Sequence, residues 1–81
     1  MTLTVHLFAR ARELAGAELV AVELPPGSTV AALHAALAAL FPPMATLLER
    51  SVIAVNHDTA NAGQVIDDGD EVAVIPPVSG G

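Results

Sequence analysis

The sequence contains no cysteine, no lysine, no tryptophan and no tyrosine. Without cysteine, a disulfide framework, a thiolate metal site and a cysteine nucleophile are all excluded. Three arginines stand against nine acidic residues, and the formal net charge is −6. Because phosphate binding requires clustered basic residues, we expect no nucleic-acid partner. The acidity indicates either simple solubility or a partner with a basic surface.

The sequence also lacks a targeting or membrane segment. Its start, MTLTVHLFAR, has no basic region followed by a long apolar run, so it does not resemble a signal peptide. The most apolar region, residues 30–48, is interrupted by Pro42 and Pro43. Its unbroken part is shorter than the roughly 20 residues of a membrane span. We therefore expect one small domain in a soluble, cytoplasmic protein.

The first half of the chain predicts two strands and a helical turn. Apolar and other residues alternate over 3–8, so that one strand face carries Leu3, Val5 and Leu7 and the other carries Thr4, His6 and Phe8. Residues 10–16 predict a short helical turn that Gly16 ends. A second strand follows over 18–25, where prolines end it.

The clearest predicted element is a helix over residues 28–41. Ser28 or Thr29 can cap its N-terminus by accepting a hydrogen bond from a free backbone amide. Apolar side chains follow at helical spacing and predict one buried stripe: Val30, Leu33, Leu37, Leu40 and Phe41. Pro42 and Pro43 end the helix. Since each buried side chain of this kind contributes about 1.5–3 kcal/mol, the helix is expected to cover the core.

The second half of the chain predicts further strands. Residues 51–56 read as a strand that ends at a turn residue, Asn56, and 57–63 read as a loop. Residues 64–66 are at most a short strand, 67–70 (DDGD) form a turn, and 71–75 form an apolar strand in the centre of a sheet. One helix packed across one face of a mixed sheet satisfies these elements. This is an α+β arrangement, the ubiquitin-like β-grasp fold.

The last six residues, PPVSGG, predict an extended tail. Pro76 and Pro77 favour extended backbone and prevent further strand pairing, so we divide the chain into a domain over 1–75 and a tail over 76–81. Gly80 and Gly81 have no Cβ and fit a narrow channel. The reactive group of the tail is the Gly81 carboxylate, which needs activation by a leaving group such as AMP before an amine, thiol or sulfide can attack it. An inert tail is the alternative.

Three stretches resemble a known family. DGDEVAVIPPVSGG (68–81) is similar to the C-terminal signature of the small subunits of molybdopterin synthase, which are ubiquitin-like sulfur carriers. LFARARELAG (7–16) resembles that family's first strand and following turn, and IAVN (53–56) resembles its middle strand. The resemblance covers nearly the whole chain.

The resemblance implies a function in molybdenum cofactor biosynthesis. An adenylating enzyme of the ubiquitin-activating type, which uses ATP, would join Gly81 to AMP, and sulfur from a cysteine desulfurase would then give a thiocarboxylate. The tail would enter the active site of the large synthase subunit and donate sulfur to a cyclic pyranopterin monophosphate, in a heterotetramer. The small subunit itself would have no catalytic side chain and no bound cofactor.

The resemblance also assigns roles to residues by position. Gly81 would carry the sulfur, and the inserted arm would consist of Pro76, Pro77, Val78, Ser79 and Gly80. Phe8 and Ile75 would belong to an apolar contact patch for the partner. Two positions differ from the family: polar Thr59 stands where relatives often carry an apolar residue, and Ile66 stands where leucine is familiar.

Other candidate sites have weaker signals. His6, His34 and His57 lie on a predicted strand, helix and loop, without ligand-like spacing, so no metal site is expected. The acidic turn at 67–70 is too short for a calcium loop. Arg10 and Arg12 could contact partner carboxylates or simply be solvated.

Three other functions compete with this interpretation. The first is a sulfur carrier for another pathway, such as that of the thiamine thiazole, and the second is a ubiquitin-like modifier attached to target lysines through Gly81. The third is a plain binding domain with an inert tail. The missing lysines would prevent an activated carrier from acylating its own copies, or they reflect a genome that favours arginine.

Overall fold

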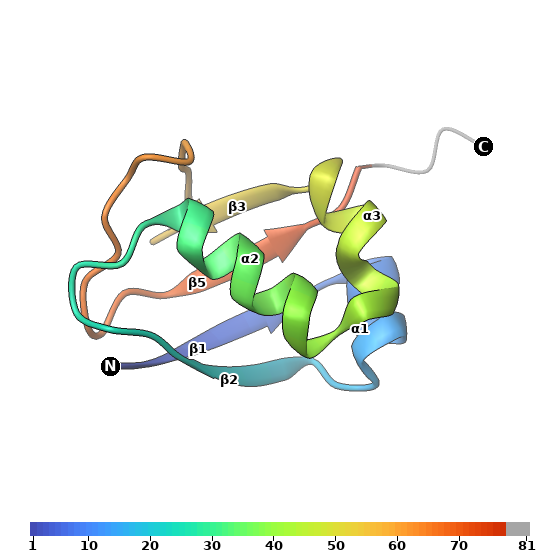
Figure 1. The fold of residues 1–81 in the computed structure, drawn as a ribbon. Coiled ribbons are helices and arrows are strands. Elements are labelled where there is room, and N and C mark those ends of the chain that lie inside the picture. Colours follow the sequence, from blue (N-terminus) through green and yellow to red (C-terminus); the bar gives the residue numbers. More distant parts are fainter. Residues whose placement is uncertain (78–81) are drawn as a thin grey trace.

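One mixed sheet carries the fold in the computed structural model, which describes residues 1–77 (Figure 1). Its strands in chain order are β1 (Thr2–Leu7), β2 (Leu19–Glu23), β3 (Val52–Val55), β4 (Asp58–Thr59) and β5 (Val72–Ile75). Their order across the sheet is β2-β1-β5-β3-β4. The helices are α1 (Ala9–Ala15), α2 (Val30–Leu40), the 3-10 helix η1 (Pro42–Met44) and α3 (Ala45–Glu49). The predicted β-grasp fold is confirmed.

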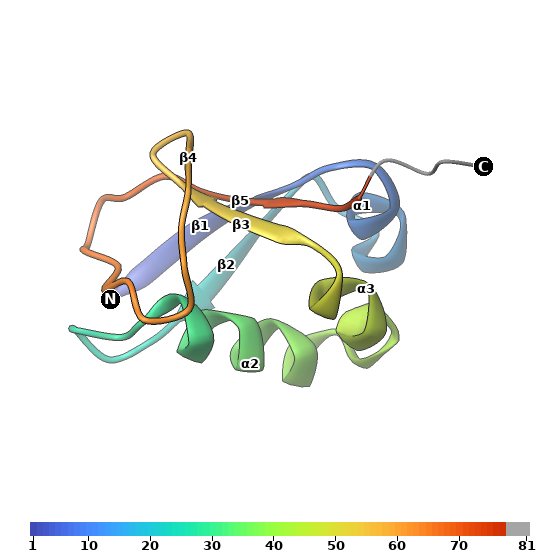
Figure 2. The ribbon, with the colours of Figure 1, turned by 90° about the horizontal axis from the view of Figure 1, so that it is seen from above.

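Strand β5 lies in the centre of the sheet, as its apolar sequence predicts. It pairs in parallel with β1 and antiparallel with β3. Helix α2 lies below one face of the sheet, and α1 lies at one end of the sheet (Figure 2). Within residues 1–77, no helix lies on the opposite face. The sheet therefore has one covered face and one open face.

The alternation predicted for the first strand decides which side chains reach each face. Leu3, Val5 and Leu7 are at most 2% exposed and pack under the sheet. Phe8, in the opposite phase, is 49% exposed. Gly16 has a φ of 73° and ends α1, as expected, because glycine adopts this left-handed conformation without steric cost.

Helix α2 begins as the sequence predicts. Between the two candidate caps, Thr29 is the N-cap, since its hydroxyl accepts a hydrogen bond from the Ala32 amide at 3.3 Å. Ser28 instead donates its hydroxyl to the Pro25 carbonyl at 2.7 Å. Val30, Leu33 and Leu37 are buried in the core.

The end of the predicted stripe is wrong in one position. Leu40 is 56% exposed, and Phe41 is only partly buried. The helix ends at Leu40 and the chain turns at Phe41, so Met44 of η1 and Leu48 of α3 fill the core there. The prolines at 42 and 43 both end α2 and start η1, which suits proline because the first amides of a helix are unpaired.

Two further predictions need correction or remain open. The segment 57–63 is not entirely loop, because Asp58 and Thr59 form β4 against β3. Residues 64–66 contribute only an isolated bridge, from Val65 to Thr29.

Strand β5 ends at Ile75, as expected, but the division into domain 1–75 and tail 76–81 stays a prediction. Within residues 1–77, no helix is long and apolar enough to span a membrane.

Candidate docking surface

The open face of the sheet carries two rows of side chains in register. In the first row, Ala73 of β5 lies between its pairing partners His6 of β1 and Ala54 of β3. In the second row, Ile75 pairs with Val52, and Phe8 follows directly after β1. These rows are apolar apart from His6, and they end where β5 gives way to the tail.

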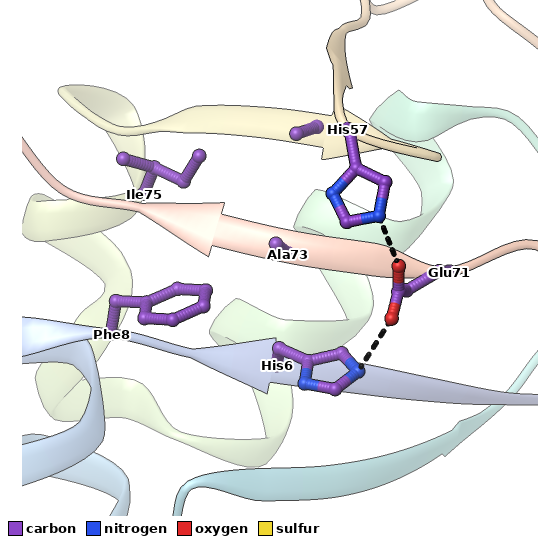
Figure 3. A pocket seen from close by; sticks show the side chains of 7 residues that line it. His6, Phe8, His57, Glu71, Ala73 and Ile75 are labelled. Atoms are coloured by element: carbon purple, nitrogen blue, oxygen red, sulfur yellow. Dashed lines mark ion pairs between the residues drawn. The ribbon is translucent and has the colours of Figure 1, made fainter.

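Phe8 and Ile75, which the resemblance assigns to a partner contact, lie together on this face (Figure 3). They border a shallow hollow of about 210 Å³. The residues that line it are His6, Phe8, Ala54, His57, Glu71, Ala73 and Ile75. Phe8 and Ile75 are 49% and 44% exposed, which is high for apolar side chains of this size. We call these seven residues the docking surface.

At one end of the docking surface, the Glu71 carboxylate lies between two imidazoles (Figure 3). Its Oε2 is 2.8 Å from His57 Nε2, and its Oε1 is 3.5 Å from His6 Nε2. Residue spacing does not predict this cluster, because His6 and Glu71 are brought together by the parallel pairing of β1 with β5. His34 lies on α2, on the covered side of the sheet.

The position of His57 follows from the turn between β3 and β4. Asn56 and His57 have φ values of 51° and 71°. Two consecutive residues with positive φ are typical of the tight turns that join antiparallel strands. The turn is tied to β5, because the Asn56 amide donates to the Glu71 carbonyl at 2.7 Å and the Glu71 amide donates to Asn56 Oδ1 at 2.9 Å. This pairing holds Glu71 next to His57.

The acidic turn before β5 is built around Asp70. Its carboxylate accepts hydrogen bonds from the Asp67 amide at 2.8 Å and from Asn56 Nδ2 at 3.0 Å. These two bonds, the Asp67 bond most, lower the pKa of Asp70 below its usual value. Gly69 has a φ of 92°, so the sequence DDGD is a turn, as predicted. In residues 1–77 no group of three or more His, Asp or Glu side chains could hold a metal ion.

Two arginines of α1, which the sequence offered as contacts for partner carboxylates, pair within the chain. Arg10 bonds Glu13 at 3.0 Å and Arg12 bonds Glu18 at 3.2 Å, and all four are exposed. Exposed pairs of this kind contribute little to stability. Thr59 is exposed in β4 and does not line the hollow.

The tail residues are only partly described. Pro76 is half-buried and Pro77 is exposed, directly after Ile75. The remaining residues assigned to the inserted arm and to the sulfur site, Val78, Ser79, Gly80 and Gly81, lie outside the described residues. Their roles stay predictions.

The fold and this open apolar face at the base of the tail define a ubiquitin-like protein of the β-grasp class. The model of the ThiS family matches residues 5–81, and the chain belongs to this family. Curated relatives include the molybdopterin synthase sulfur carrier subunits of Arabidopsis thaliana and Escherichia coli. The first is 38% identical over 95% of this chain and 80% of its own length, and the second is 41% identical over 95% and 96%. The resemblance stated from the sequence is confirmed.

Solved structures show the same architecture. Small archaeal modifier protein 1 of Haloferax volcanii has a TM-score of 0.85 and 28% identity, over 95% of this chain and 98% of its own. A complex of subunits 1 and 2 of the molybdopterin-converting factor of Helicobacter pylori includes a chain with a TM-score of 0.64, with full coverage of both chains. At 24% identity, that likeness shows the fold alone.

Proposed function

We propose that this protein is the sulfur carrier subunit of a molybdopterin synthase. The observation that supports the proposal most directly is its homology to curated subunits of that name over 95% of the chain. The exposed apolar docking surface at the base of the tail agrees with it. A sulfur carrier needs a surface that binds its partner and a reactive group that carries the sulfur to that partner.

The reactive group in this proposal is the Gly81 carboxylate. An activating enzyme of the ubiquitin-activating type would catalyse attack of a carboxylate oxygen on the α-phosphate of ATP, which releases pyrophosphate and leaves an acyl adenylate. The terminal sulfur of a persulfide, supplied by a cysteine desulfurase, would then displace AMP and give an acyl disulfide. A thiol would cleave the S–S bond of that acyl disulfide, which leaves the thiocarboxylate on Gly81 and a new disulfide on the sulfur donor. The ATP belongs to the activating enzyme, and the carrier holds no cofactor in this scheme.

The docking surface would place the tail in the large synthase subunit. Phe8 and Ile75 are the exposed apolar anchors, and Ile75 directly precedes Pro76, the first residue of the arm. Burying apolar side chains contributes roughly 25 cal/mol per Å² removed from water. A partner seated on this face would therefore hold the base of the arm close to its own active site.

A second candidate function is protein modification. It is favoured by the likeness to a small archaeal modifier protein at 28% identity over nearly the full chain. The chemistry would start from the same adenylate but end in an amide with a lysine of a target protein. A thiazole-pathway carrier is less well supported, since the curated relatives compared above are molybdopterin synthase subunits.

Deletion of Gly81 tests the proposal. The truncated protein keeps a terminal carboxylate on Gly80, but that group ends one extended residue short, about 3.3–3.6 Å. Since a displacement of about 1 Å can lower a rate roughly a hundredfold, sulfur transfer should fail. The assay is conversion of the pyranopterin precursor with the large subunit, the activating enzyme, ATP and sulfide.

The control is the thermal midpoint of the same variant, which should equal that of the full chain, since the buried core of residues 1–77 is complete without Pro76 and Pro77. Near-normal product from a folded truncation would exclude Gly81 as the carrier. Intact mass of protein from its own cells separates the candidates further: one oxygen replaced by sulfur indicates a carrier, and adducts of larger proteins indicate a modifier.

A further inference from the structure

We propose that docking on this surface is coupled to the uptake of one proton by the His6–Glu71–His57 cluster. The inference rests on the proposed function, because it requires a partner that covers the docking surface. It assigns a role in partner binding to the cluster. Once the cluster has taken up a proton, an apolar surface of the partner can bury the Glu71 carboxylate at a lower cost in free energy.

The cluster forms part of the hollow and cannot be avoided by a partner that fills it. All three side chains line the same hollow as Phe8 and Ile75. The Glu71 side chain is 48% exposed in the free protein, and those of His6 and His57 are 37% and 86% exposed. A partner that buries the anchors would therefore remove water from the carboxylate.

Covering an unpaired carboxylate is unfavourable, because a charge loses its hydration in a medium of lower dielectric constant. The two imidazoles give the protein its own means of compensation. With both imidazoles neutral, the cluster carries one negative charge, and with one proton added it is neutral overall. Removal of water favours the neutral cluster, so the docked state should bind one more proton than the free state.

The surrounding charges do not replace this proton. Arg12, on α1 beside His6, is paired with Glu18. Asp70 precedes Glu71 and Asp58 follows His57, and the carboxylates of both favour a protonated imidazole. Asn56 is an uncharged neighbour of the cluster. Its side chain donates a hydrogen bond to the Asp70 carboxylate and accepts one from the Glu71 amide.

The distances assign the proton mainly to His57. Its Nε2 is 2.8 Å from a carboxylate oxygen, whereas His6 Nε2 is 3.5 Å from the other oxygen. A charge-assisted hydrogen bond is strongest at the shorter distance. His6 is the secondary site, so its replacement should reduce the uptake less than replacement of His57.

The sign of the pH dependence follows from this uptake. A docked state that binds one more proton than the free state is favoured by a high proton concentration. Affinity should then weaken as the pH rises, by up to about tenfold per pH unit between pH 7 and 8.5. The dependence should level off in acid, once the free and docked states bind the same number of protons.

Titration calorimetry of the full-length protein with the purified large subunit tests the inference. Binding is measured at pH 8 in phosphate and in Tris, because the difference in heat between buffers of unequal ionisation enthalpy gives the number of protons exchanged. We expect uptake of about one proton. Glu71→Gln should abolish the uptake, and His57→Gln should lower it more than His6→Gln. His34→Gln is the matched control on the other layer and should leave it unchanged.

The outcomes separate this inference from the proposed function. If the large subunit does not bind at all, or Phe8→Asp leaves binding unchanged, the proposed docking surface is wrong. If binding is normal but no proton is taken up, or a proton is released, only the cluster's role is overturned. Uptake that persists in Glu71→Gln would also overturn the assignment.

Discussion

Leu37 and Leu40 lie three residues apart on α2 but in opposite surroundings, since Leu37 is fully buried and Leu40 is 56% exposed. The same substitution at both positions should therefore have unequal effects. Leu37→Ala should lower the free energy of unfolding by about 2–5 kcal/mol, because it removes packed methyl groups and leaves a cavity. Leu40→Ala should change it by less than about 0.5 kcal/mol. Urea denaturation measures both, and equal losses would contradict the assignment of the core.

Phe8→Asp should weaken binding to the large subunit strongly and leave the fold intact. Phe8 is 49% exposed and borders the hollow, so the fold loses little when it is replaced, whereas a docked partner would cover a new charge. Val65→Asp is a matched control, because Val65 is 50% exposed but does not line the hollow. Circular dichroism checks the fold and calorimetry the affinity. Equal affinities of the two variants for the large subunit would mean that the contact lies outside this surface.

Asp70 should contribute to stability in a pH-dependent way. Hydrogen bonds from the Asp67 amide and from Asn56 lower its pKa below the usual 3.8 in the folded state. The unfolded state therefore binds the proton more readily, so the contribution is complete above pH 3.8 and is lost as the pH falls through the lower folded value.

The measurement is the free energy of unfolding of wild type and Asp70→Asn as a function of pH. Their difference should be constant near neutrality and shrink in acid. Asp68→Asn is the control in the same turn, since no side-chain hydrogen bond of Asp68 occurs among residues 1–77. The difference in the free energy of unfolding between wild type and Asp70→Asn could instead stay constant down to pH 2. That result would argue against the contribution of these hydrogen bonds.

The lack of lysine predicts that the activated protein does not acylate other copies of itself through side chains. The sequence also has no cysteine, so the two strongest side-chain acceptors for an acyl adenylate are missing. Gln64→Lys introduces an amine at an exposed position. After incubation with the activating enzyme and ATP, this variant should give self-conjugates that wild type does not. If the variant gives no more than wild type, a genome that favours arginine is the better explanation.

The sequence predicts which face of the sheet Phe8 occupies, because alternation along one strand is a local property. It does not predict the neighbours of that strand. Glu71 meets His6 only through the parallel pairing of β1 with β5, and that pairing is set by the packing of the whole domain. The burial of Leu40 was predicted wrongly for a similar reason. Helical periodicity predicts which face of the helix is apolar. It does not predict where the core ends along that face, because Met44 and Leu48, which follow the helix in the sequence, fill the core there.

The central position of β5 has a consequence for synthesis. The strand that fills the middle of the sheet, Val72–Ile75, follows every other strand in the sequence. On the ribosome, β1 and β3 have no neighbour between them until these residues have emerged, so the sheet is completed last at its centre. A product that terminates before β5 lacks the strand shared by both halves and should be cleared as unfolded protein. Completion of the fold thus coincides with the appearance of the segment that leads into the tail.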